Sequence, residues 1–288
     1  MGPHRLATAL ACLLAAMPTG ARAAAPPPAG PAAPAVAWKE LRFAAHKAGI
    51  SASIHLRLDR EQDGAVGGIG LESATRLPGR TFVTRERIDP VDARARVIVD
   101  TETGAKHHRK TYTLGERAFR LELEQPASLT EMMQPPERWT KRTDSVVRFP
   151  QALPAGAVVT GPIGLLYAAS SAALASPGDA MTIHVLVQTQ VERVTVRVEG
   201  AEPVDLAFEE IAEGRTELVH ERLTALRLVA HSQPVDPDSA SAFRIFGLEG
   251  DVQLLWDPVR RLPVELSGHV KMLGPVTVRL ASVTLVGP

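Results

Sequence analysis

The chain has 288 residues, with 32 basic and 32 acidic side chains, 45% hydrophobic residues and only 4% aromatic residues. This composition excludes a collagen and a charge-rich disordered chain, and the single cysteine excludes a disulfide scaffold. The balanced charge gives no electrostatic reason to expect nucleic acid as a partner. The composition instead predicts a folded protein rich in β-structure.

The first 23 residues follow the pattern of an export signal. His4 and Arg5 form a short basic start, and an apolar run follows from Leu6 to Met17. The tripeptide Ala21-Arg22-Ala23 provides the small residues that a signal peptidase reads. The apolar run is too short to cross a bilayer. We therefore expect cleavage after Ala23, a location in the periplasm or outside the cell, and no transmembrane span in the mature chain.

The only cysteine, Cys12, lies inside this apolar run. The mature protein would then carry no thiol, so a disulfide, a cysteine-ligated metal and a cysteine nucleophile are all excluded. The competing interpretation is a lipoprotein with Cys12 as its lipidated first residue. We expect no lipidation, because Ala9-Leu10-Ala11 is a poor lipidation signal and the apolar run continues beyond the cysteine.

A spacer follows the signal. The segment from Ala24 to Ala37 holds five prolines among alanine and glycine. Proline fixes φ and removes amide donors, so this segment is expected to be extended. It either holds the domain away from a surface or has no specific role. We expect the folded part to begin at Trp38 and to form a single antiparallel β domain over residues 38–288.

Apolar residues recur with period two along much of this domain. Val264 and Leu266 alternate with Glu265 and Ser267, which is typical of a half-buried strand. In the last strand the apolar parity changes, which predicts a bulge near Ala281. Further strands are expected at 41–58 with a bend at Gly49, and at 80–88, 95–100, 106–113, 118–123, 181–188, 194–198, 204–209, 226–228 and 245–256.

These strands, joined by short turns rich in Gly, Pro and Asp, define the expected fold class. We predict a mostly β protein with one large curved antiparallel sheet or open barrel. The sequence shows no alternation of strands with helices, so a doubly wound parallel fold is not expected. The glycine-rich stretch 64–70 is interpreted as a flexible hairpin loop, because acidic neighbours would repel a phosphate.

One uncharged segment, Phe149 to Gly178, breaks the strand pattern. Residues 162–175 within it predict a helix, since Gly161 can cap it and Pro162 suits the first helical position. No face of this helix carries charge, so we expect it to be buried against the concave face of the sheet, with the sheet wrapping around it. Five residues at helical spacing are candidate ligand-binding residues if the helix lines an apolar cavity, and core residues otherwise: Ile163, Leu166, Tyr167, Ser170 and Leu174.

Several short stretches together carry a resemblance to a known family. They are Leu41-Arg42-Phe43 followed by Gly49, the apolar Ile163–Tyr167, Trp256-Asp257, Leu262-Pro263-Val264, and the last strand, Val276–Leu285. In these residues the chain resembles a family of exported bacterial proteins known only as a domain of unknown function, DUF3108. Such proteins are similar to the half-barrel lipoprotein carriers of the periplasm, which implies a curved sheet wrapped around a helix and an apolar cavity. Family members carry an acidic residue and a serine just before the midway helix, where this chain has Gly161-Pro162.

No motif of a catalytic class occurs in the sequence. There is no nucleophile elbow, phosphate loop, zinc-protease motif or cysteine pair. The adjacent His107 and His108 would point to opposite faces of a strand, so they are poorly placed to share a metal ion. Glu122 and Glu124 fit the wet side of an amphipathic strand. We therefore expect no enzyme activity, no metal and no cofactor.

Two functional hypotheses stay open. In the first, the exported protein binds a lipid or another apolar ligand in a cavity between sheet and helix. In the second, it is an envelope structural or interaction module without a small ligand, and an edge strand or the proline-rich arm meets an envelope protein. The first predicts a cavity lined by few large side chains. The second predicts a filled core and an exposed, uncharged sheet edge.

Overall fold

The computed structural model describes residues 36–61, 68–271 and 273–286 of the chain. The predicted signal peptide, Cys12 and residues 24–35 of the predicted spacer lie outside the described residues. Trp38, the predicted start of the folded domain, is the first residue of the first strand and is fully buried.

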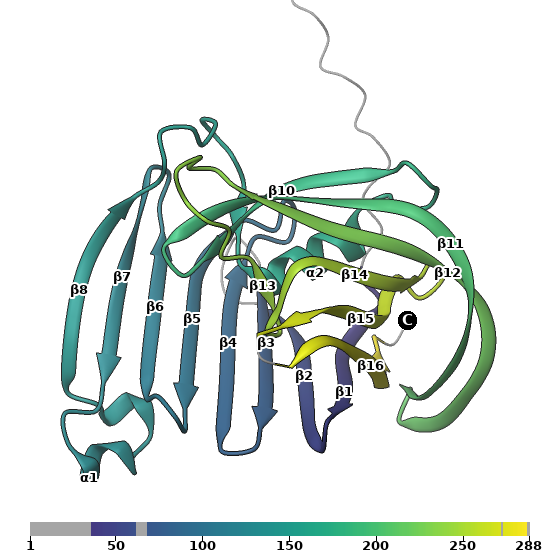
Figure 1. Ribbon diagram of the computed structural model, residues 1–288, viewed down its shortest axis with the longest axis horizontal. Helices are drawn as coiled ribbons and strands as arrows, with labels where there is room; N and C mark the ends of the chain where they lie inside the picture. Colours follow the sequence, from purple (N-terminus) through teal and green to yellow (C-terminus); the bar gives the residue numbers. More distant parts are fainter. Residues whose placement is uncertain (1–35, 62–67, 272, 287–288) are drawn as a thin grey trace, which may run out of the picture. The chain divides into compact units, whose positions relative to one another are not determined.

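The first half of the domain is an antiparallel meander in which each strand pairs with the next (Figure 1). Ala48 and Gly49, with φ of 51° and 78°, form a two-residue turn at the predicted bend. A short helix, α1 (Leu129–Met132), and a 3-10 turn, Pro136–Arg138, precede the last of these strands. The strands are β1 (Trp38–Lys47), β2 (Ile50–Glu61), β3 (Gly68–Leu77), β4 (Arg80–Ile88), β5 (Ala95–Thr103), β6 (His108–Leu114), β7 (Ala118–Gln125) and β8 (Lys141–Arg148).

The second half adds one helix and the remaining strands. These elements are β9 (Val159–Thr160), α2 (Pro162–Ser171), β10 (Ala180–Val187), β11 (Gln190–Ala212), β12 (Arg215–Pro234), β13 (Arg244–Ile245), β14 (Leu248–Asp257), β15 (Leu262–Val270) and β16 (Gly274–Leu285). The last strand pairs with the first. The sheet order is therefore β8-β7-β6-β5-β4-β3-β2-β1-β16-β15-β14-β12-β11-β10-β9, with β13 paired to β14.

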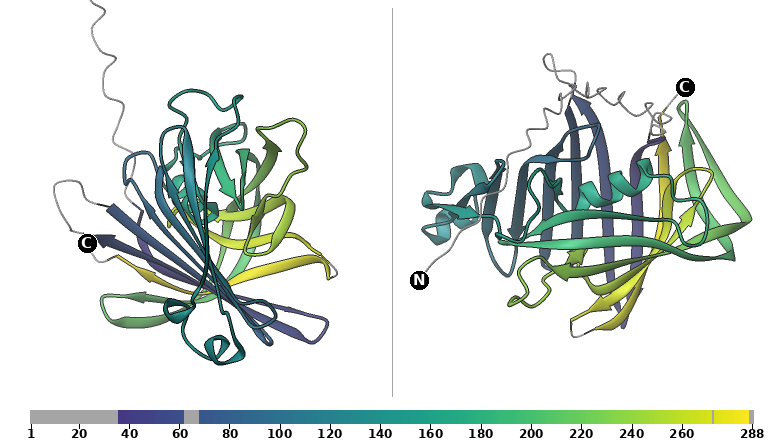
Figure 2. Two further views of the ribbon diagram at one scale, coloured as in Figure 1. Left: turned by 90° about the vertical axis from the view of Figure 1, so that its left-hand side faces the viewer. Right: turned by 90° about the horizontal axis from the view of Figure 1, so that it is seen from above.

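The predicted fold class is confirmed, since one large curved sheet of 16 strands contains most of the described residues (Figures 1 and 2). The sheet is mixed, however, and not purely antiparallel. Strand β9 runs parallel to β10, and residues 209–211 of β11 run parallel to residues 282–284 of β16. The second pairing arises because the long β11–β12 hairpin bends back to the sheet, which closes a partial ring through β11, β12, β14, β15 and β16.

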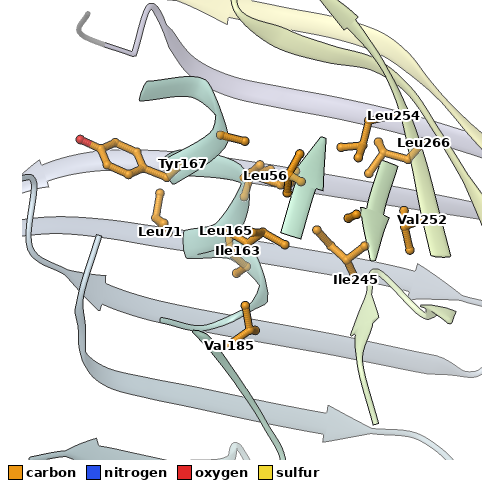
Figure 3. Packing of buried hydrophobic residues seen from close by; sticks show 14 of the residues in the cluster. Leu56, Leu71, Ile163, Leu165, Tyr167, Val185, Ile245, Val252, Leu254 and Leu266 are labelled. Atoms are coloured by element: carbon orange, nitrogen blue, oxygen red, sulfur yellow. The ribbon is translucent and has the colours of Figure 1, made fainter. Parts of the chain in front are cut away.

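Helix α2 lies within the curve of the sheet (Figure 2). It contacts β3 and β4 from the meander, and β9, β10 and β13 from the second half. Figure 3 shows its apolar side chains among those of β2, β3, β10, β13 and β14. The helix ends at Ser171, four residues earlier than predicted, because Ala172 has the extended ψ of 154°.

The predicted parity of the C-terminal strands is confirmed. Val264 and Leu266 are buried, at 2% and 0% exposure, whereas Glu265 and Ser267 are half-buried. In the pairing of β1 with β16, Arg42 faces Ser282 and Phe43 faces Leu280, so Ala281 is skipped. This residue is the predicted bulge, and it lets the strand bury alternate side chains on both sides of the irregularity.

Candidate functional site

Charged side chains from distant parts of the sheet bind the two ends of the uncharged helix α2. Glu86, on β4, accepts backbone N–H bonds from Ile163 at 2.8 Å and from Gly164 at 2.9 Å. The first turn of a helix leaves such N–H groups without partners inside the helix, and the N-cap Gly161 has no side chain to bind them. A carboxylate 77 residues away in the sequence therefore caps the helix.

The Glu86 carboxyl group is buried, with 2% of the residue exposed. Burial raises its pKa from 4.5 to about 7, although the backbone N–H groups of Ile163, Gly164 and Gly161 oppose this shift. The positive end of the helix dipole also favours a negative charge here. The helix thus depends on an acid that titrates near neutral pH.

Two glycines allow this close approach. A Cβ atom on Gly161 would lie 2.2 Å from Glu86 Oε1, and one on Gly164 would lie 1.9 Å from Thr160 Oγ1. Both distances are far inside van der Waals contact, so any larger residue would displace the carboxylate or the preceding strand. Gly161 and Gly164 therefore leave room for an acidic cap supplied by β4.

The other end of α2 is held by a basic side chain. Arg261, in the turn between β14 and β15, donates from Nε to the carbonyl oxygen of Ser170 at 2.9 Å and from Nη2 to that of Ala172. A cation at a helix C-terminus interacts favourably with the negative end of the helix dipole, and its N–H groups bind carbonyl groups that have no partner in the helix. Opposite charges from two distant parts of the sheet therefore fix both ends of the helix.

The neighbouring Arg260 ties the long hairpin to the same turn. Its guanidinium binds Glu210 of β11 at 2.8 Å, Glu221 of β12 at 2.6 Å and the fully buried Asp257 at 2.8 Å. It also lies over the ring of Phe208, 5.5 Å from the centroid. These contacts join the hairpin to the β14–β15 turn at the place where the sheet forms its partial ring.

All five predicted ligand-binding residues lie in the core. Ile163, Leu166, Tyr167, Ser170 and Leu174 are each 7% exposed or less. The Tyr167 hydroxyl donates to the carbonyl oxygen of Pro90 at 3.2 Å. Ser170 donates to the carbonyl oxygen of Leu166 and accepts from the Trp38 indole at 3.3 Å. The polar atoms of the set are thus satisfied within the protein.

The space between α2 and the sheet is nearly filled. A cavity of about 10 Å³ lies beside Leu165, Leu166 and Ala169, enclosed by Val196, Phe243, Leu254 and their neighbours. This volume holds about one water molecule and is far below the several hundred Å³ of a small-molecule site. A lipid chain would have to displace the helix. The ligand-binding role of the five residues stays a prediction, and core packing is the role that their contacts support.

Enlarging Leu166 tests whether this packing is tight. Leu166→Trp is expected to lower the free energy of unfolding by about 1 to 3 kcal/mol, because the cavity has no room for an indole. Urea unfolding measures the loss, and Val259→Trp, at a position 85% exposed, is the control. A Leu166→Trp protein of unchanged stability, with wild type but not the variant binding a hydrophobic dye, would instead support a ligand cavity.

The polar residues considered for chemistry form no metal cluster in the described part of the chain. Among the described residues no group of three or more His, Cys, Asp or Glu side chains is close enough to hold a metal ion. His55 lies 2.9 Å from Glu40, and His46 bonds to Ser51 at 3.0 Å. Of the glycine-rich stretch 64–70, residues 68–70 belong to strand β3 and not to a loop, and residues 64–67 lie outside the described part.

The two edges of the sheet differ sharply. Strand β9 has two residues, both buried, whereas β8 has eight residues and pairs only with β7 (Figure 1). Within β8, Val146 is 72% exposed. The edge carries Lys141, Arg142, Asp144 and Arg148, so it differs from the uncharged edge that the interaction hypothesis predicted. Because β8 is long and pairs on one side only, it is the open edge of the described sheet.

The pairing of β7 with β8 fixes which backbone groups of this edge are free. Phe149 N–H bonds to Arg117 O at 3.0 Å, and the register places these two residues opposite each other. Hydrogen-bonded and non-hydrogen-bonded pairs alternate in an antiparallel ladder. The even-numbered residues of β8 therefore direct their N–H and C=O groups away from β7. These residues are Arg142, Asp144, Val146 and Arg148.

None of the helices in the described ranges is long and apolar enough to cross a membrane. No protein-family model, curated protein or solved structure matches the chain. The resemblance to the DUF3108 family therefore stays a prediction, and the functional argument rests on the residues of this chain alone.

Proposed function

We propose that the protein is a non-enzymatic, exported envelope protein that binds a partner polypeptide by adding a strand to the open edge β8. The observation that carries this proposal is the set of outward-directed backbone groups along β8. An extended segment can satisfy these groups by continuing the antiparallel ladder. Export is supported by the signal pattern of residues 1–23, as in the periplasmic location expected from the sequence.

The charges on β8 indicate what kind of segment would fit. Asp144 binds Arg120 at 2.8 Å, and Arg142 binds Glu124 at 3.1 Å. Lys141 and Arg148, at the two ends, have no ion-pair partner among the described residues. Opposite charges across a strand pair stabilise it. A partner segment with acidic residues near its ends therefore matches this edge.

A second copy of β8 would be a poor partner. Antiparallel pairing of two copies about Ser145, which brings the outward-directed backbone groups together, would place Arg142 opposite Arg148 at both ends. Like charges directly opposite each other destabilise a strand pair, and basic residues are a common protection of sheet edges against self-association. The edge thus favours a different, acidic polypeptide.

Photo-crosslinking at position 146 tests the proposal. A benzophenone amino acid replaces Val146 in cells that export the protein, and the same residue at the exposed position 259 serves as the control. We expect a protein adduct from position 146 alone. Peptide mapping of that adduct should give an extended segment with acidic residues.

A backbone variant then shows whether the adduct forms by strand addition. Asp144→Pro removes an outward-directed N–H, and the β7 ladder does not use this donor. Asp144→Asn removes the same charge and keeps the N–H. The adduct should be lost with proline and retained with asparagine. No adduct from position 146, or an adduct that persists in the proline variant, would contradict the proposal.

The apolar-ligand hypothesis remains a second candidate, motivated by the uncharged helix. It requires α2 to leave the position that Glu86 and Arg261 hold. The nearly filled space beside the helix favours strand addition over this alternative.

A further inference from the structure

A polar hollow lies on the outer face of the second half of the sheet, opposite the face that packs against α2. Its volume is about 560 Å³, which is within the range of small-molecule sites. Val194 and Val196 of β11 point toward the core and are buried, while Arg193 and Arg197 point outward and are exposed. The hollow is lined by Thr182, Arg193, Thr195, Arg197, Glu199, Val229, His231, Gln233 and Asp251.

The centre of the hollow is a row of hydrogen-bonding side chains. Thr182 of β10, Thr195 of β11 and His231 of β12 lie opposite one another in the register. The two threonine hydroxyls are 3.1 Å apart. His231 Nδ1 lies 2.6 Å from Asp251 Oδ1, and its Nε2 lies 3.5 Å from Gln233 Nε2. Hydroxyl donors are thus concentrated at one point of the floor.

Two guanidinium groups flank this row. Arg193 and Arg197 are each two residues from Thr195, which is about 7 Å along a strand. Arg193 donates to the side-chain oxygen of Gln233, a neutral group. Arg197 has no side-chain partner among the described residues. Neither arginine therefore has a carboxylate partner within the described part of the chain.

The two acids of the hollow are bound to other side chains. Asp251 is bound to His231 at 2.6 Å. Glu199 lies 3.8 Å from the guanidinium of Arg227, which also lies 4.0 Å from Glu202. The acids thus leave both arginines of the hollow available to an anion.

We propose that this hollow binds a tetrahedral oxyanion, a phosphoryl group above all. Guanidinium groups present paired N–H donors that match phosphate oxygens, and charge-assisted bonds of this kind are stronger than neutral ones. The threonine hydroxyls provide further donors between the two arginines. The group could belong to a small phosphorylated solute or to a lipid headgroup, since both present the same chemistry. The site is separate from β8 and does not depend on the function proposed for that edge.

Calorimetric titration of the full chain tests this site with two probes. One is inorganic phosphate, and the other is vesicles of phosphatidylglycerol compared with vesicles of phosphatidylcholine. We expect binding of at least one phosphate probe, weakened about tenfold or more by Arg197→Gln or Arg193→Gln. Arg197→Lys should have a smaller effect, because it keeps the charge and loses the paired donors. Binding of inorganic phosphate would identify a free solute, and binding of phosphatidylglycerol vesicles alone would identify a headgroup.

Arg215→Gln is the matched control, because it removes one positive charge from an exposed position outside the hollow. It should leave binding unchanged. The arginines of the hollow point into solvent, so melting temperatures of all variants should match wild type. Absence of binding for both probes, or equal weakening by Arg215→Gln and Arg197→Gln, would overturn the proposal.

Discussion

Glu86→Ala is expected to lower the free energy of unfolding by about 3 kcal/mol at pH 5. The substitution removes the carboxyl oxygens that accept from Ile163 and Gly164, and each buried N–H left without a partner costs about 1 to 3 kcal/mol. Urea unfolding measures the change. Glu72→Ala is the control, because Glu72 pairs with Arg85 on the exposed face and should cost less than about 1 kcal/mol. Equal losses for the two variants would show that Glu86 does not hold the helix.

The pH dependence of stability gives this prediction a second readout. The pKa of Glu86 is raised to about 7 in the folded protein, so the folded state binds this proton more tightly than the unfolded state. The contribution of Glu86 to the free energy of unfolding is fully present below about pH 4.5 and is lost as the pH rises through about 7. It amounts to at most about 3 kcal/mol.

Glu86→Gln isolates this contribution, because the amide does not titrate. Wild type should lose more stability than the variant between pH 5 and pH 8. Burial also raises the pKa of Asp100, so both proteins keep a residual slope of the same sign. The difference between their slopes is therefore the quantity to compare, and identical slopes would contradict the assignment of the neutral-range titration to Glu86.

Leu266→Asp is expected to cost at least about 4 kcal/mol of unfolding free energy. Leu266 is fully buried on β15 between Leu254 of β14 and Val278 of β16. An aspartate there would be an unpaired carboxyl group in an apolar core, which is among the most destabilising single changes. Thermal or urea unfolding measures the loss, and failure of the variant to fold would agree with the prediction.

The adjacent Ser267→Asp is the matched control for register. Ser267 lies on the other side of the strand and is half-buried, between Gln253 and Thr277 of the neighbouring strands. The same new side chain should cost less than about 1 kcal/mol at this position. Similar losses for both variants would mean that the parity of β15 is different from the one described.

Local sequence pattern predicted those parts of the fold where one face is buried and the other wet. The alternation in β15 and the bulge at Ala281 belong to this class, whereas the burial of helix α2 was predicted from the absence of any charged face. Strand β8 was missed because its residues are exposed on both sides, which leaves no apolar alternation to detect. The β11–β12 hairpin was predicted in pieces, since Gly200 and Pro203 interrupt the pattern of a strand that continues through them.

The contacts that fix the helix could not be predicted from local pattern. Glu86 and Arg261 lie 77 and 91 residues from the backbone atoms they bind. Each looks like an ordinary charged residue of a strand or turn, and only the pairing of distant strands brings it to a helix end. The one hint was the absence of any charge within α2, which left both helix ends to be satisfied by other elements.

Native mass spectrometry of the protein purified from the cells that export it tests the central claim most directly. The account holds that α2 is a fixed core helix beside a space of about 10 Å³, and that the partner polypeptide binds at the edge of the sheet. It predicts no bound mass that depends on the α2 core, so the spectra of wild type and Leu166→Trp should differ only by the mass of the substitution. An added mass of several hundred daltons that organic solvent removes, and that Leu166→Trp abolishes, would contradict it.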